Sequence, residues 1–290
     1  MSADRPTVLA VGGGRGLAAT LRALRLLPVD PVAVVSVADD GGSTGRLRAD
    51  ADRAAPGDLR KCLVALAGEP SPLSRVMEHR FETGELEGHS FGNLMIAALE
   101  EAEGSLLGAL EVVSCLLDVQ GRVLPATAEF VELVAELDDG SEVVGQAEIA
   151  ATSGLSTVRL RPAPSTCPSV LAALSEASAV VLGPGSLFTS VLAAAVVPGL
   201  AEAISEAGAP VVYVCNLAPQ AHETDGYDVA AHVGALHRHG LSPDVVLHDP
   251  ACLDGADGVR GAVPAHLAGP TGRAHDPRQL ARALAPHLGI

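Results

Sequence analysis

Two glycine-rich segments of this chain have the composition of an anion-binding site: residues 12–16 (Gly-Gly-Gly-Arg-Gly) and residues 183–190 (Gly-Pro-Gly-Ser-Leu-Phe-Thr-Ser). Each follows a short apolar run that predicts a buried strand, and each precedes a predicted helix. Such a turn presents free backbone N–H groups and the positive end of a helix dipole to an anion, and glycine permits close approach. Because the carboxyl ends of parallel strands meet at one edge of a sheet, the two turns predict a shared crevice for a phosphate-bearing ligand. The alternative for the first turn is a tight connection without a ligand.

A third polar segment follows the second predicted strand, residues 31–37. It begins with Asp39 and Asp40 and continues through glycines and hydroxyls, Ser43 among them, to Arg46. An acid at the end of the second strand is where a dinucleotide-binding fold places its ribose-binding carboxylate. The segment could hold sugar hydroxyls, a heterocycle or a metal-bound phosphate, in which case Asp39 or Asp40 would bind Mg²⁺. The alternative is a solvated turn, since Asp and Gly both favour turns.

Further polar residues lie where helices are predicted to begin. Asp58 is suited to cap the helix that follows it, and capping alone would explain it. His89 and Asn93 lie at the entrance of a later helix, where we expect them to contact a ligand. Glu223 and Thr224 follow the strand predicted at residues 210–215, and either contact a ligand or cap the next helix.

The order of the predicted elements indicates an α/β fold. Strands and helices alternate, which predicts a Rossmann-like, doubly wound and mostly parallel sheet in a single domain, residues 1–290. Residues 120–162 depart from this pattern and predict an inserted antiparallel β-hairpin or sheet extension. Two strands flank the turn signal Asp138-Asp139-Gly140. No residue of this insertion is predicted to take part in chemistry.

The composition limits the classes of function. The chain has 290 residues, a formal net charge of −16 and a sequence pI near 4.9, which argues against a nucleic-acid groove or a membrane surface as partner. No apolar run reaches membrane-spanning length, and the first residues lack a signal-peptide core. The five cysteines are scattered, without a Cys-x-x-Cys pair, as in a protein of the reducing cytosol. We therefore expect a cytoplasmic protein.

Six motifs, in this order, resemble the YvcK branch of the CofD-like superfamily, the branch of the gluconeogenesis factors. They are Gly-Gly-Gly-Arg-Gly-Leu at 12–17, Ala-Asp-Asp-Gly-Gly-Ser-Thr-Gly-Arg-Leu-Arg at 38–48, Pro-Gly-Asp-Leu-Arg at 56–60, Gly-His-Ser-Phe-Gly-Asn at 88–93, Gly-Pro-Gly-Ser-Leu-Phe-Thr-Ser at 183–190, and Cys-Asn-Leu at 215–217 followed by Gln220 and Glu223-Thr224. The resemblance covers nearly the whole chain. It implies a cytoplasmic protein needed for normal cell shape and wall synthesis on gluconeogenic carbon sources. Members of this branch bind UDP-sugars, UDP-N-acetylglucosamine in particular, whereas the CofD branch uses magnesium to transfer a phospholactyl-type group to a deazaflavin coenzyme precursor.

Carried over residue by residue, the resemblance places Gly13, Gly14, Asp39, Asp40, Asn93, Gly185, Ser186 and Asn216 around the nucleotide, and Arg273 corresponds to a late arginine of the family. With the residues singled out above, the predicted ligand contacts are Gly12, Gly13, Gly14, Arg15, Gly16, Asp39, Asp40, Ser43, Arg46, His89, Asn93, Gly183, Gly185, Ser186, Asn216, Glu223, Thr224 and Arg273. The chain departs from the family at Arg15, where a small hydroxyl residue is usual, and at His222, where the family has glycine. The segment between Asp249 and Arg273 is also short and lacks a tyrosine.

Three functions compete. The first is a UDP-sugar-binding regulator, expected to form a homodimer and to need no cofactor other than a possible Mg²⁺. The second is a CofD-type transferase, in which Asp39 or Asp40 would hold magnesium or position the acceptor hydroxyl. The third is an NAD dehydrogenase, for which the single lysine, Lys61, leaves little material for a Tyr–Lys catalytic pair.

Overall fold

The large sheet of the protein is parallel and has the strand order of a doubly wound fold. A computed structural model describes residues 5–49, 53–68 and 71–290. Seven strands lie in the order β10-β9-β8-β7-β1-β2-β3, and every neighbouring pair is parallel. Their bounds are β1 Thr7–Gly12, β2 Asp30–Val35, β3 Arg122–Pro125, β7 Ala177–Leu182, β8 Val211–Val214, β9 Val245–His248 and β10 Ala262–Pro264. The order reverses between β1 and β7, where such sheets bind ligands. The predicted fold class is confirmed.

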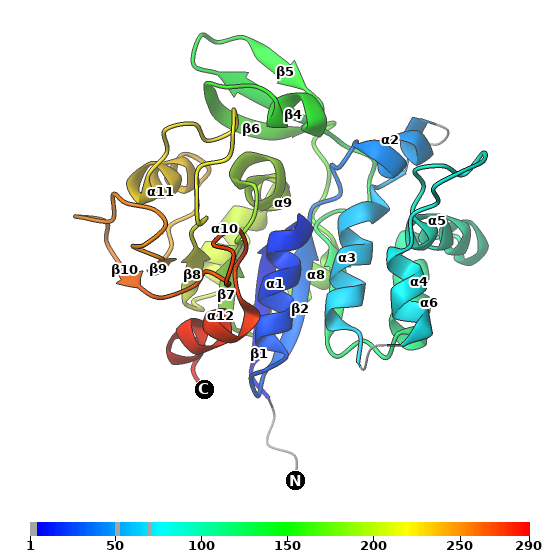
Figure 1. Ribbon diagram of the computed structural model, residues 1–290, viewed down its shortest axis with the longest axis horizontal. Coiled ribbons are helices and arrows are strands. Elements are labelled where there is room, and N and C mark those ends of the chain that lie inside the picture. Colours follow the sequence, from blue (N-terminus) through cyan, green and yellow to red (C-terminus); the bar gives the residue numbers. More distant parts are fainter. Residues whose placement is uncertain (1–4, 50–52, 69–70) are drawn as a thin grey trace.

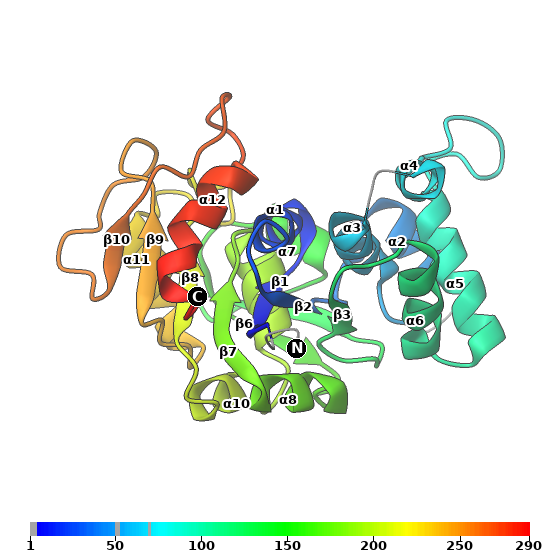
Figure 2. The same cartoon turned by 90° about the horizontal axis from the view of Figure 1, so that it is seen from below.

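Helices cover both faces of this sheet (Figure 2). On one face lie α1 (Gly14–Leu24), α3 (Pro56–Leu66) and α12 (Pro277–Leu284), and on the other α8 (Pro168–Ser175) and α10 (Leu200–Glu206). Beyond the β3 edge lie α4 (Pro72–Glu78), α5 (Phe91–Glu103) and α6 (Leu106–Leu116). The remaining helices are α2 (Gly42–Ala49), α7 (Gln146–Ala150), α9 (Ala193–Ala195), α11 (Val229–Arg238), the π-helix η1 (Leu187–Leu192) and the 3-10 turn η2 (Ala285–His287).

The core explains why the first strand and helix form where they do. The four apolar residues of β1 that follow Thr7 are fully buried, as expected of a central parallel strand covered on both faces. Leu17, Leu21 and Leu24 of α1 are also fully buried, so the helical spacing seen in the sequence marks the face that packs on the sheet.

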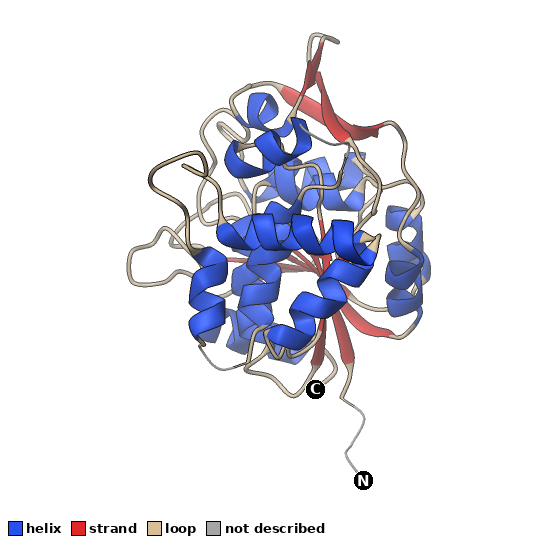
Figure 3. Cartoon of the chain, turned by 90° about the vertical axis from the view of Figure 1, so that its right-hand side faces the viewer, coloured by secondary structure: helices blue, strands red, loops and turns tan. Residues whose placement is uncertain are grey.

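A second, antiparallel sheet of three strands lies beyond the carboxyl ends of the parallel strands (Figure 1), and the two sheets form separate groups of strands in Figure 3. Its order is β5 (Glu142–Val144), β4 (Glu132–Leu137), β6 (Leu155–Arg161). The predicted hairpin is β4–β5, and β6 adds a strand to it. The antiparallel segment begins later than residue 120, because β3 pairs with β2 in the large sheet.

Among the described residues, no helix taken alone has the length and apolar composition to cross a membrane; the pair Leu187–Ala195 and Leu200–Glu206 reaches them only when joined across a bend of 71°.

Candidate functional site

A pocket of about 920 Å³ opens at the carboxyl ends of β1 and β7, where the strand order reverses. Both glycine-rich turns line it, although they are far apart in the sequence. The two turns also touch. A Cβ on Gly16 would overlap the carbonyl oxygen of Pro184 and would lie 2.7 Å from Cα of Gly185. The turns therefore form one wall, as the sequence predicts, and Gly16 is the residue that lets them meet.

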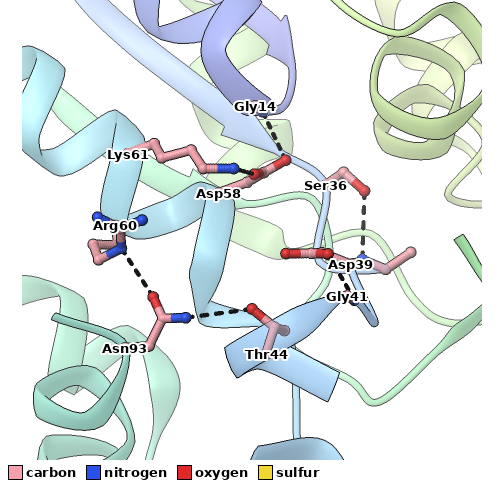
Figure 4. A network of polar contacts seen from close by, with 10 residues as sticks. Gly14, Ser36, Asp39, Gly41, Thr44, Asp58, Arg60, Lys61 and Asn93 are labelled. Atoms are coloured by element: carbon pink, nitrogen blue, oxygen red, sulfur yellow. Dashed lines mark hydrogen bonds and ion pairs between the residues drawn. The ribbon is translucent and has the colours of Figure 1, made fainter. Parts of the chain in front are cut away.

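The first glycine-rich turn binds a carboxylate of the protein itself, that of Asp58. The Gly14 N–H donates to Oδ2 of Asp58 at 2.6 Å, and Nζ of Lys61 lies 2.8 Å from Oδ1 of the same carboxylate (Figure 4). Asp58 is in the first turn of α3, after the N-cap Ala55, and is buried. The N–H group expected to bind phosphate is thus taken by a side chain from another helix.

The second turn has the same arrangement. Oε1 of Glu223 accepts hydrogen bonds from the N–H groups of Phe188 at 2.7 Å and Thr189 at 3.1 Å, at the start of η1. Oε2 accepts a third from the Thr189 hydroxyl at 3.1 Å. Burial raises the pKa of Glu223, and these hydrogen bonds oppose the rise. Glu223 caps η1 and does not line the pocket.

Asp39 is the acid of the 39–40 pair that faces the pocket. Its Oδ1 accepts from the Gly41 N–H at 3.1 Å (Figure 4). Burial, and then the charge of Asp58, raise the pKa of Asp39. Two carboxylates at one pocket suit sugar hydroxyls, or a Mg²⁺ ion that keeps most of its water ligands. No group of three or more His, Cys, Asp or Glu side chains with metal-binding geometry occurs within residues 5–49, 53–68 and 71–290.

Several predicted contacts serve the scaffold behind the pocket. The carboxylate of Asp40 binds the backbone of α7. Asn93 is buried, accepts from Nε of Arg60 at 2.9 Å and donates toward Ser43 at 3.3 Å (Figure 4 draws the Arg60 contact). Nδ1 of His89 lies 3.2 Å from the Ser43 hydroxyl.

The other predicted residues away from the pocket lining also have structural contacts. Arg46 donates to the Glu87 carbonyl at 2.7 Å, and the Thr224 hydroxyl accepts from the Gln220 N–H at 2.8 Å. The carbonyl of Gly183 accepts from the Thr20 hydroxyl at 2.8 Å, and Gly12 ends β1. The four predicted contacts Gly12, Arg46, Gly183 and Thr224 are therefore not among the residues that line the pocket.

Two arginines supply positive charge to the pocket. Arg15 and Arg273 both line it and are exposed, and neither guanidinium has a hydrogen-bond or ion-pair partner in the described part of the chain. Asn216 accepts from the Gly185 N–H at 3.3 Å, and the Ser186 hydroxyl accepts from Nε2 of Gln220 at 2.8 Å. The pocket can therefore attract an anion with side chains while its backbone turns are held by internal contacts.

The structure adds pocket residues that the sequence did not single out as ligand contacts: Asp58, Lys61, Gln146, Gln220 and His275. Lys61 could have been noticed in the sequence, because it is the only lysine of the chain and follows Asp58 by three residues. Nothing in the sequence indicated Gln146, because it belongs to the insertion. His222, where the resemblance leads us to expect glycine, adopts a φ of 70° in the left-handed region that favours glycine.

The family model described as "2-phospho-L-lactate transferase CofD" matches residues 8–256. The chain belongs to the CofD family. A "Putative gluconeogenesis factor" of Deinococcus radiodurans is 46% identical over 96% of this chain, and a "Gluconeogenesis factor" of Halalkalibacterium halodurans is 42% identical over 86% of it.

The same fold occurs in the crystal structure of a UPF0052 family member from Bacillus halodurans. It superimposes with a TM-score of 0.92 at 35% identity and covers 98% of this chain and all of that one. The chain spans 65% of the Deinococcus relative's length and 51% of that of a similarly named relative from Nostoc.

Proposed function

We propose that this CofD-family protein binds a UDP-sugar, UDP-N-acetylglucosamine, and acts as a regulator that links gluconeogenic growth to cell shape and cell-wall synthesis. The observation that carries the proposal is the pocket at the reversal point of the sheet. Two carboxylates line it, together with two arginines that have no partner within residues 5–49, 53–68 and 71–290. A diphosphate linked to two sugars has the complementary chemistry, since it offers phosphate oxygens to the arginines and hydroxyl groups to the carboxylates.

The charges around the pocket support one orientation of the proposed ligand. Asp58 and Glu223 already accept hydrogen bonds from backbone N–H groups at the starts of α1 and η1, so Arg15 and Arg273 would balance the negative charge of the diphosphate. Asp39, at the end of β2, accepts hydrogen bonds from ribose hydroxyls, the role of this position in dinucleotide-binding sheets. Binding of this kind leaves the ligand intact, and its consequence in the cell would follow from a partner that recognises the occupied form.

Calorimetry and thermal denaturation with UDP-N-acetylglucosamine test the proposal. Ligand at one hundred times Kd stabilises a protein by about 2.7 kcal/mol, which corresponds to a rise in Tm of about 5 °C for a chain of this size. Glucose 6-phosphate serves as a control for nonspecific anion binding. Absence of a Tm shift at millimolar UDP-N-acetylglucosamine would refute the proposal.

The second candidate is a magnesium-dependent transferase of the CofD type. Two observations favour it. The matching family model describes such a transferase, and Asp58 lies close enough to Asp39 for its charge to raise the pKa of Asp39. Asp39 and Asp58 would hold Mg²⁺, which would stabilise charge on the transferred phosphoryl group. Formation of a phospholactyl-type product from a nucleotide-activated phospho-acid and a deazaflavin precursor, lost in Asp39→Asn, would support this candidate.

The single domain, the homodimer and the cytoplasmic location stay predictions.

A further inference from the structure

Gln146 brings the antiparallel insertion into the pocket. It is the first residue of α7, between β5 and β6, and it lines the pocket together with Asp39 and the glycine-rich turns. Its side-chain amide has no hydrogen-bond partner among the residues that the structure describes. An amide offers two donors and one acceptor, so a half-buried glutamine at this position is equipped to bind a polar ligand group.

The backbone of Gln146 is fixed by Asp40. Oδ2 of Asp40 accepts from the Gln146 N–H at 2.8 Å, and Oδ1 accepts from the Ala147 N–H at 2.9 Å. The preceding Gly145 has a φ of 102°, and a Cβ there would lie 2.8 Å from Oδ2 of Asp40. Glycine at 145 therefore allows the carboxylate to approach, and the carboxylate in turn determines where Gln146 enters the pocket.

The position of Asp39, the residue before Asp40, indicates which part of a nucleotide would lie near Gln146. Asp39 lines the pocket at the end of β2, where a doubly wound sheet places the ribose of a nucleotide. Because Asp40 immediately follows Asp39 and binds the backbone of α7, Gln146 enters the pocket beside the segment that carries Asp39, whereas Arg273 comes from the loop before α12. The N–H and carbonyl edge of a uracil ring is complementary to a side-chain amide.

We propose that Gln146 binds the base of the bound nucleotide and that Asp40 is a positioning residue for it. The proposal rests on the function proposed above. It gives the insertion a direct part in ligand recognition, and it makes the contact between α7 and the 39–40 segment a link between the ligand and the antiparallel sheet.

Isothermal titration of wild type and Gln146→Ala with UDP and with UDP-N-acetylglucosamine tests the assignment. We expect affinity for both ligands to fall by about tenfold, the loss of roughly one good hydrogen bond, because both contain the base. Gln120→Ala, an exposed glutamine outside the pocket lining, is the matched control and should bind as wild type does.

Each other outcome overturns the assignment in a distinct way. If Gln146→Ala binds UDP as tightly as wild type but loses affinity for UDP-N-acetylglucosamine, the side chain meets the sugar and the placement is wrong. If both affinities are unchanged, Gln146 does not contact the ligand. If wild type binds neither compound, the proposed function itself fails and this inference falls with it.

A double-mutant cycle tests the role of Asp40. If Asp40 acts through Gln146, Asp40→Ala weakens UDP binding in the wild-type background and causes no additional loss in Gln146→Ala. A merely structural role would weaken binding by the same factor in both backgrounds. Additive losses would therefore contradict the positioning role.

Discussion

Replacement of Gly16 by alanine tests whether the two glycine-rich turns depend on their mutual contact. Gly16 lies in the first turn of α1, where alanine is intrinsically favoured over glycine by about 1 kcal/mol. The added Cβ, however, would overlap the Pro184 carbonyl oxygen and lie 2.6 Å from its carbon. Backbone atoms cannot rotate away as a side chain can, so the turns must separate, at a cost near the upper end of the usual 1–3 kcal/mol for overpacking. The net loss in unfolding free energy should be about 2 kcal/mol.

Urea denaturation of Gly16→Ala beside Gly234→Ala measures this loss against a matched helical glycine. Gly234 lies in α11, and a Cβ there would have only the end of the Arg238 side chain nearby, at 3.8 Å. Gly234→Ala should therefore gain up to about 1 kcal/mol, so the two variants should differ by about 3 kcal/mol. Unfolding of Gly16→Ala at the same urea midpoint as wild type, or at a higher one, would refute the reasoning.

Three further predictions concern single side chains. Asp39→Asn should stabilise the protein at neutral pH. Because the pKa of Asp39 is raised in the folded state, the folded protein binds this proton more tightly than the unfolded chain, and stability falls as pH rises from 3.8 through the folded pKa. The urea midpoint of the variant should not show this fall. Glu223→Ala should cost about 3 kcal/mol, because two backbone N–H groups of η1 lose their acceptor, and an unchanged melting temperature would contradict this. Arg15→Ser, which removes one of the two pocket arginines, should weaken UDP-N-acetylglucosamine binding about tenfold in a titration while the Tm without ligand stays constant.

The sequence predicted the architecture well where a single physical cause dominates. The apolar run of β1 and the leucine spacing of α1 each reflect burial on a known face, and both elements form as expected. The strand β6 was not predicted. Its buried residues Leu155, Val158 and Leu160 are unevenly spaced, because the pairing with β4 shifts register near Leu137, and this breaks the alternation that identifies a strand.

The sequence indicated which residue types occur near the pocket but not which groups each side chain contacts. Asp39, Asp40 and Glu223 look alike in the sequence, as acids in polar loops after strands. Only Asp39 lines the pocket, while the other two accept hydrogen bonds from backbone N–H groups of α7 and η1. Which N–H group a carboxylate meets depends on contacts across the fold, and Asp40 and Gln146 are separated by 106 residues. No local pattern contains that information.

The internal carboxylates have a consequence for the protein without its ligand. The carboxyl groups of Asp58 and Glu223 accept hydrogen bonds from backbone N–H groups at the starts of α1 and η1, where nucleotide-binding proteins usually receive a phosphate. Both turns are therefore held by internal hydrogen bonds, so little of the free energy of binding should be spent on ordering them. If the pocket takes the ligand proposed above, its occupancy should follow ligand concentration directly.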